Sequence, residues 1–237
     1  MKYLYFFFIS MFFITNSWSQ TYEIGGLFGS TSFVGDVGAT KVFVADEFFE
    51  SEKQSYGVLF RWNRSNRHSF RFSFMQINTR GIDADSDILE RQVRDLSFET
   101  SLREFSLGVE YTFWEWDLHD MKRPQTVPYL STGIAYFFTD HYGVVADELN
   151  EFGNLNAFAL PLTLGVKTTL GNKVVLSGEF SARYTFTDNI DGSAPDEIGN
   201  DNAFPSFGNP NSNDWYIFAG FSITYMFGRK PCYNCIL

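Results

Sequence analysis

Residues 55–77 read SYGVLFRWNRSNRHSFRFSFMQI, and on both sides of the central turn every second side chain is aromatic or aliphatic. The apolar positions are Tyr56, Val58, Phe60, Trp62, Phe70, Phe72 and Phe74. Successive side chains of a β-strand point to opposite faces of the sheet, so each half of this stretch has one apolar and one polar face. The stretch therefore predicts two antiparallel strands with an apolar environment on one face and a polar environment on the other.

The same alternation predicts eight strands, at residues 21–30, 55–63, 68–77, 99–113, 128–138, 159–169, 173–187 and 214–227. Short or intermediate connections alternate with long ones, which lie near residues 31–54, 78–98, 139–158 and 188–213. Ten residues of about 3.3 Å each, tilted by about 40°, span about 25 Å, the height of the apolar band of an outer-membrane barrel. We therefore expect an all-β fold, an eight-stranded antiparallel up-and-down transmembrane β-barrel of the outer membrane, packed inside, with both termini periplasmic.

The first 19 residues have the features of a secretory signal peptide. Lys2 precedes an apolar stretch at residues 3–15, and Ser17 and Ser19 place small residues before a cleavage point. No other window reaches the roughly 20 apolar residues that a membrane-spanning helix needs. We assign residues 1–19 to the signal peptide, 20–228 to the barrel and 229–237 to a periplasmic tail that contains two cysteines.

The composition also fits a membrane barrel. Aromatic residues make up 19% of the chain, with 28 Phe and 12 Tyr, yet the mean hydropathy is −0.15. Half of each strand and all loops of such a barrel are polar, which accounts for this combination. The net charge of −10 argues against nucleic acid as a partner. The acidic residues gather in the long connections, where they either bridge divalent cations to lipopolysaccharide or only keep the surface soluble.

The polar faces of the predicted strands carry charged residues of both signs in equal number. They are Glu23, Arg61, Arg71, Glu104, Glu110, Lys167, Glu179 and Arg183. The interior of an eight-stranded barrel is only just wide enough for side chains, so charges inside it must pair. The balance predicts a barrel-interior charge network. The alternative is a lipocalin-like soluble barrel with its apolar face inside, but large aromatic residues such as Trp62 and Trp215 favour a lipid-facing surface.

Two motifs suggest chemistry but lack the residues which that chemistry needs. The segment DADSD at residues 83–87 opens like a calcium loop, but Ile88 stands where Gly is required and Arg94 where Glu is required. A looser cation site in this loop stays open. His68 and Ser69 are adjacent, but neighbouring strand residues point to opposite faces, so they do not predict the paired His and Ser of a hydrolase.

Cys232 and Cys235 have the spacing of a redox motif without the surrounding βαβ pattern. A local disulfide, free thiols and attachment to a partner all remain open for this pair. We expect no catalytic residue, no metal site and no cofactor, and therefore no enzymatic activity.

Motifs spread over nearly the whole mature chain are similar, in order and spacing, to those of a known family. They are residues 22–25 (YEIG), 35–38 (GDVG), 94–98 (RDLSF), 127–130 (VPYL) with Gly133 and Ile134, 183–188 (RYTFTD) with Asp191, and 214–216 (DWY) before the cysteine-containing tail. The chain thereby resembles the PorG-like outer-membrane β-barrels of the type IX secretion system of Bacteroidota. Asn189 departs from the aromatic or basic residue expected there, and the longer loop motifs of the family are absent, so a paralogue without the secretion role is an alternative.

The resemblance implies a non-enzymatic component that docks a periplasmic ring lipoprotein (PorK-like) and its soluble partner (PorN-like) to the outer membrane. Topology and the paired cysteines motivate the hypothesis that the periplasmic turn 114–127 and the tail make this contact. The partner-binding residues are then Lys122, Arg123, Arg229, Lys230, Cys232 and Cys235. The alternative function is an OmpX-like surface barrel whose acidic loops bind lipopolysaccharide, cations or other cells. A lipid A-modifying enzyme ranks third because no catalytic constellation is present.

Overall fold

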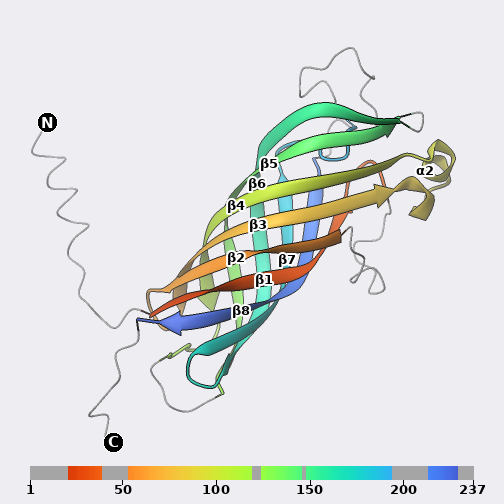
Figure 1. Ribbon diagram of the computed structural model, residues 1–237. Helices are drawn as coiled ribbons and strands as arrows, with labels where there is room; N and C mark the ends of the chain where they lie inside the picture. The colour runs from red at the N-terminus through yellow and green to blue at the C-terminus, as the bar shows by residue number, and fades with distance from the viewer. Residues whose placement is uncertain (1–20, 39–52, 119–123, 146–147, 194–212, 229–237) are drawn as a thin grey trace, which may run out of the picture.

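The protein is a closed barrel of antiparallel strands (Figure 1). The structure, a computed structural model, describes residues 21–38, 53–118, 124–145, 148–193 and 213–228. Within these residues the strands are β1 (Thr21–Val34), β2 (Gln54–Asn63), β3 (His68–Ile82), β4 (Ser97–Thr112), β5 (Thr126–Val145), β6 (Glu148–Leu170), β7 (Val174–Thr185) and β8 (Trp215–Phe227). Two short helical segments, η3 (Asp83–Asp85) and α2 (Leu89–Arg94), lie between β3 and β4. Each strand pairs with the next, and β1 pairs with β8, so the predicted fold is confirmed.

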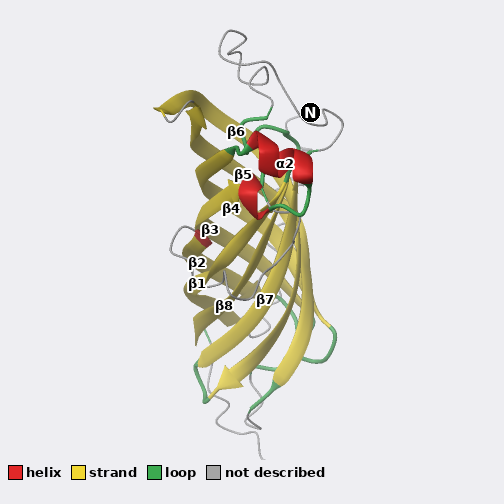
Figure 2. Cartoon of the chain, turned by 90° about the vertical axis from the view of Figure 1, so that its right-hand side faces the viewer, coloured by secondary structure: helices red, strands yellow, loops and turns green. Residues whose placement is uncertain are grey.

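The barrel has two unlike ends. The start of β1 and the end of β8 lie side by side because Tyr22 pairs with Phe227, and antiparallel order brings the connections after β2, β4 and β6 to the same end. We call this the terminal end and the opposite one the loop end, beyond which α2 stands (Figure 2). The terminal-end turn after β6 contains Gly171 at φ 64°, a left-handed conformation that glycine adopts without strain from a Cβ atom.

The main difference from the prediction concerns residues 139–158, which we expected to form a long loop. In the structure β5 and β6 continue through this region as a paired ribbon, from Thr139 opposite Leu155 to Val145 opposite Glu148, with one register shift between His141 and Tyr142. The ladder consists of main-chain hydrogen bonds, which polar side chains do not prevent. The Asp, Asn and Glu residues that suggested a loop therefore lie on an extended hairpin.

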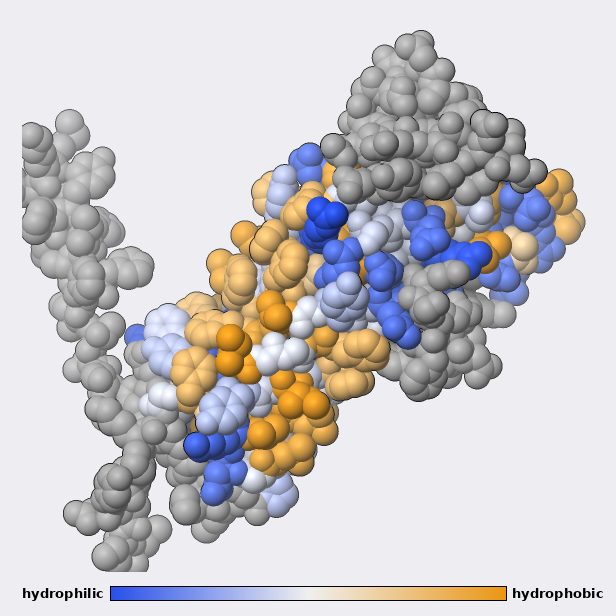
Figure 3. Space-filling model, viewed as in Figure 1, coloured by the Kyte–Doolittle hydropathy of each residue, from blue (hydrophilic) through white to orange (hydrophobic). Residues whose placement is uncertain are grey.

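The barrel wall is apolar outside and polar inside. Leu162 and Leu164 on β6 are 54% and 57% exposed, whereas Thr163 between them is 5% exposed. On the face seen in Figure 3, orange apolar atoms gather over the strands. A water-soluble barrel would reverse these two faces, so the lipocalin-like alternative is wrong and the apolar band fits a lipid surrounding. Within the described residues, no helix is long and apolar enough to cross a membrane.

The interior is filled from one end to the other. A small apolar cluster of Trp116, Leu118, Val127, Val175 and Met226 occupies the terminal end. A larger cluster fills the half towards the loop end and includes Leu27, Leu59, Met75, Leu102, Phe137 and Phe218. The charged residues of the wall lie between these clusters and at their borders.

Candidate functional site

Arg61 is the centre of the first group of interior charges. Its Nε lies 2.9 Å from Glu110 Oε2 and its Nη1 lies 3.2 Å from Glu23 Oε2. Lys167 completes the group, with Nζ 2.6 Å from Glu110 Oε1. All of these side chains are fully buried, so each charge depends on its partners rather than on water.

A second group joins β3 to β7 across the barrel. Arg71 donates two parallel hydrogen bonds to Glu179, at 2.9 and 2.7 Å, and the Tyr129 hydroxyl donates to Glu179 Oε2 at 2.7 Å. Tyr129 reaches this position because its β6 partner is Gly165, where a Cβ atom would lie 2.5 Å from Tyr129 Cζ. A bidentate guanidinium–carboxylate pair fixes geometry as well as charge, so this group ties opposite walls together.

A third group lies nearer the loop end. Arg183 Nε is 2.8 Å from Glu104 Oε2, and the buried Tyr216 hydroxyl donates to the same carboxylate oxygen. A cavity of about 20 Å³ lies between Arg71 and Arg183, and half of the residues that line it are serine or threonine. That volume accommodates roughly one water molecule. Between the two apolar clusters, the described interior is therefore filled mainly by paired charges and polar side chains.

The structure places the whole predicted interior set inside the barrel. Glu23, Arg61, Arg71, Glu104, Glu110, Lys167, Glu179 and Arg183 are each at most 6% exposed, and each has an oppositely charged partner within 4.0 Å. Tyr129 and Tyr216 complete the network, and they were not among the interior residues predicted from the sequence. The signal was available in strand parity, because both share the inward face with charged residues of their neighbours: Tyr129 pairs with Gly165 on the Lys167 face, and Tyr216 pairs with Arg183.

The terminal end is closed by the connection between β4 and β5. Trp116 and Leu118 are each 2% exposed, and the Trp116 backbone N–H donates to Asn66 O at 2.8 Å. The Lys167 ammonium lies 4.8 Å from the centroid of the Trp116 ring, within cation–π range. Within the turn 114–127, where we expected a partner contact, these two residues turn inward and cover the end of the core. Trp114 and Glu115 remain exposed.

The loop end is closed by the segment that follows β7. Ile190 is fully buried, its backbone N–H donates to Asp214 Oδ2 at 2.8 Å and its carbonyl accepts from Thr100 Oγ1 at 3.1 Å. Asp191 extends the closure to the segment after β1, since its Oδ2 accepts from the backbone N–H groups of Asp36 and Val37 at 2.8 and 3.0 Å. These contacts join β4, β1 and β8 across one mouth of the barrel.

The carboxyl groups of this closure have shifted acidities. Burial raises the pKa of Asp214 well above its usual value, and the negative charge of Asp191 raises it further, while the hydrogen bond from Ile190 opposes the change. Burial also raises the pKa of Asp191, against hydrogen bonds from Ser193, Val37 and Asp36. The folded protein therefore holds a proton at Asp214 more tightly than the unfolded chain does.

The segment DADSD at residues 83–87 is a structural clamp. Asp83 is buried, its Oδ1 accepts from the Gly38 N–H at 2.9 Å and its Oδ2 accepts from Arg94 Nε at 2.8 Å. Asp85 and Asp87 lie on the surface. Because Arg94 supplies the positive charge, the carboxylate of Asp83 is satisfied by the protein itself. The described residues contain no group of His, Cys, Asp and Glu side chains arranged to hold a metal ion.

The structure describes only some of the remaining candidate residues. Lys122, Arg123, Arg229, Lys230, Cys232 and Cys235 all lie outside the described residues. His68 faces outward, and its ring centroid lies 5.3 Å from that of Tyr111. Ser69 faces inward, and its hydroxyl donates to Asn63 Oδ1 at 2.8 Å. The two therefore point to opposite faces, as strand geometry predicts.

A family profile described as Domain of unknown function (DUF6089) matches residues 2–236. The chain belongs to this family. The match spans the barrel and almost all of the sequence on either side of it. A comparison with curated protein sequences finds no match.

Solved structures similar to this DUF6089 protein are small outer-membrane proteins. Ail of Yersinia pestis, solved with the heparin analogue sucrose octasulfate, is 8% identical, with a TM-score of 0.48 over 89% of this chain and 100% of Ail. The N-terminal β-barrel domain of Pseudomonas aeruginosa OprF is 12% identical, with a TM-score of 0.46 over 87% and 97%. A major outer membrane protein of Thermus thermophilus is also 12% identical, with a TM-score of 0.46 over 87% and 99%. The fold assignment itself rests on the strand pairing and the two faces of this barrel.

Proposed function

We propose that this protein is a non-enzymatic, non-conducting barrel of the outer membrane that anchors other proteins at its ends. One observation carries this proposal, namely that apolar clusters and paired charges fill the lumen between two closed mouths. A barrel of this kind offers no path for a solute. Its usable surfaces are the lipid-facing wall and the two ends.

The proposed machine is the type IX secretion system, with a PorK-like ring lipoprotein and its PorN-like partner docked at the terminal end. The support for this assignment is the resemblance, in order and spacing, of several sequence motifs to those of PorG-like proteins. The exposed cations Arg64, Arg67 and Lys173 at the terminal end add a surface suited to an anionic partner. β8 ends with Phe227 at this same end, and the segment that contains Cys232 and Cys235 follows it in the sequence.

Affinity purification of the full-length protein from outer membranes tests this role. We expect the ring lipoprotein to co-purify, and deletion of residues 229–237 to reduce its recovery while the barrel remains folded. Deletion of the gene should abolish secretion of proteins that carry a type IX C-terminal signal. Normal secretion with altered adhesion would instead support the OmpX-like surface barrel.

We further propose that the terminal end faces the periplasm and the loop end faces outward. Short turns on the periplasmic side and longer connections outside are the usual arrangement of such barrels. Labelling of intact cells with a membrane-impermeant maleimide provides the test. Gln92→Cys on α2 should react, whereas Asn66→Cys in the turn after β2 should react only after the outer membrane is opened, and the reverse pattern would contradict the orientation.

A further inference from the structure

The loop end carries an apolar group that the lipid-facing belt does not explain. On α2, Leu89 is 68% exposed and Val93 is 79% exposed, and Ile88 just before the helix is 39% exposed. Leu89 and Val93 occupy positions i and i+4, so they lie on one face of the helix. Figure 3 shows apolar atoms at the far right, where α2 projects past the strands of the wall (Figure 1).

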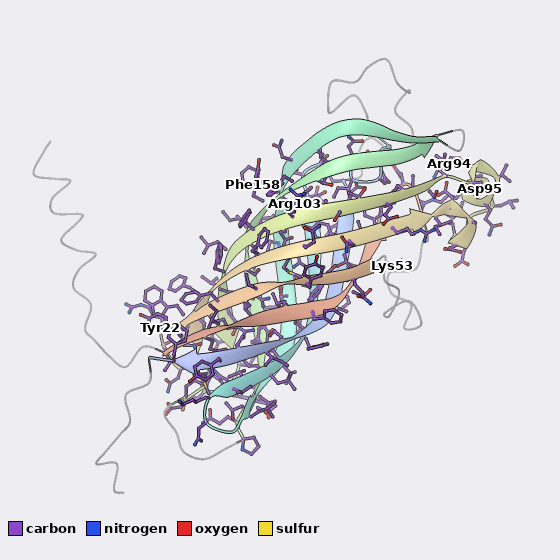
Figure 4. The ribbon with its side chains drawn as sticks, in the orientation of Figure 1. Tyr22, Lys53, Arg94, Asp95, Arg103 and Phe158 are labelled. Atoms are coloured by element: carbon purple, nitrogen blue, oxygen red, sulfur yellow. The ribbon has the colours of Figure 1, made fainter. Side chains whose placement is uncertain are left out.

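This helix is held in one position by its two arginines. Arg91 donates from both terminal nitrogens to the carbonyls of Gly38 and Gly35, at 3.0 and 3.1 Å. Arg94 lies at the base of α2 (Figure 4) and donates to Asp83 and to the Asp36 carbonyl, at 2.8 Å in each case. A surface that is already ordered loses little conformational freedom when a partner binds it.

The exposed charges around the apolar group are acidic. The exposed charged residues of the connection are the acidic Asp85, Asp87, Glu90 and Asp95. Its two basic residues are half-buried: Arg91 donates to the Gly35 and Gly38 carbonyls, and Arg94 donates to Asp83. An apolar centre with a polar border is the usual anatomy of a protein interface. The acidic border repels a second copy of the same surface, and it also repels anionic lipid headgroups.

We propose that this surface, the α2 tip (Ile88, Leu89 and Val93 bordered by Asp85, Asp87, Glu90 and Asp95), docks a protein that presents an apolar pocket flanked by lysine or arginine. The site lies at the opposite end of the barrel from the contact proposed for the ring lipoprotein. The proposal for the α2 tip does not depend on that contact, and the two are tested separately.

Photo-cross-linking in intact cells tests the proposal. A photoreactive amino acid replaces Val93 in the full chain, and the adduct is sequenced by mass spectrometry. We expect one discrete protein adduct whose cross-linked peptide combines apolar residues with Lys or Arg. Its yield should fall roughly tenfold with Leu89→Ser, and similarly with the combined change Asp85→Asn, Asp87→Asn and Glu90→Gln, a change equivalent to about 1.4 kcal/mol of binding free energy.

Ala84→Ser is the control, because Ala84 is an exposed residue of the same connection that belongs neither to the apolar group nor to its acidic border, and it should leave the yield unchanged. A photoreactive residue at Asn66, at the terminal end, should not give this adduct. The proposal is overturned if the adducts are lipopolysaccharide, a second copy or residues 39–52 of the same chain. It is also overturned if no protein adduct forms, or if both variants leave the yield intact.

Discussion

At the scale of single residues, Gly165 makes room for the side chain that joins two interior groups. The Tyr129 ring passes over Gly165, its hydroxyl donates to Glu179 at 2.7 Å, and its face lies 5.6 Å from the Arg61 guanidinium carbon. An aromatic residue beside a glycine of the neighbouring strand fills the space that a missing side chain leaves. Gly165 is required here because it has no side chain that would occupy the space of the Tyr129 ring.

We therefore expect Gly165→Ala to lower the free energy of unfolding by about 1–3 kcal/mol, the usual cost of overpacking a filled core. Urea unfolding in lipid vesicles, followed by tryptophan fluorescence, measures the change. Gly178→Ala is the matched control, because a Cβ atom on this exposed strand glycine meets nothing within 4 Å. Equal effects of the two substitutions would show that packing against Tyr129 is not the cause.

The pair formed by Arg71 and Glu179 gives a prediction about charge. Arg71→Met leaves the buried Glu179 carboxylate without its guanidinium, and removing one partner of such a pair costs about 3–5 kcal/mol of folding free energy. Adding Glu179→Gln should recover part of this loss, because the side chain becomes neutral and still accepts the Tyr129 hydroxyl. The urea midpoints of unfolding of Arg71→Met and of the double variant measure this recovery of stability. A double variant less stable than Arg71→Met would contradict the ion-pair explanation.

At the scale of structural elements, the connection between β4 and β5 closes the terminal end. Trp116→Ala removes a 2% exposed ring that packs with Leu118 and covers Lys167, so we expect a loss of about 3–5 kcal/mol. Trp114, 61% exposed and two positions earlier, supplies the control, and its replacement by Ala should cost far less in the same unfolding assay. If Trp114→Ala lowers the free energy of unfolding equally, the burial of Trp116 does not explain the loss of stability.

The closure of the loop end should depend on pH. Because the pKa of Asp214 is higher in the folded than in the unfolded chain, the closure is most stable at acid pH. It weakens as the pH rises above the unfolded value of about 3.9 and passes through the folded pKa. The hydrogen-exchange protection of the Ile190 and Val37 amides, corrected for intrinsic exchange rates, should fall with rising pH. Asp214→Asn should flatten this dependence, and an unchanged slope in that variant would assign the effect to another group.

At the scale of the whole molecule, the filled lumen predicts that the protein does not conduct ions. Planar bilayers containing the purified full-length barrel should show no discrete current steps. A variant with Trp116→Ala should behave in the same way, because the charge groups around Arg61 and Arg71 still fill the lumen behind the plug. Regular single-channel currents from the unaltered protein would contradict the packed interior.

The strands and their faces were predictable because alternation is a local property with a period of two residues. The same parity placed Glu23, Arg61 and Lys167 on the inner wall. The ribbon at 139–158 was missed because polar side chains are compatible with main-chain pairing. The inward turn of Trp116 was missed because an aromatic residue just after a strand fits an interfacial girdle as well as a plug.

By itself, the sequence determined the eight strands, the closure of the barrel, its apolar exterior and the sign of each interior charge. Only the tertiary structure decided which charges pair, because partners such as Arg71 and Glu179 lie on strands that are not neighbours in the sheet. It also decided that both mouths are closed and that Leu89 and Val93 stand exposed on an anchored helix. These features depend on distances across the barrel and between loops, which periodicity along one strand does not encode.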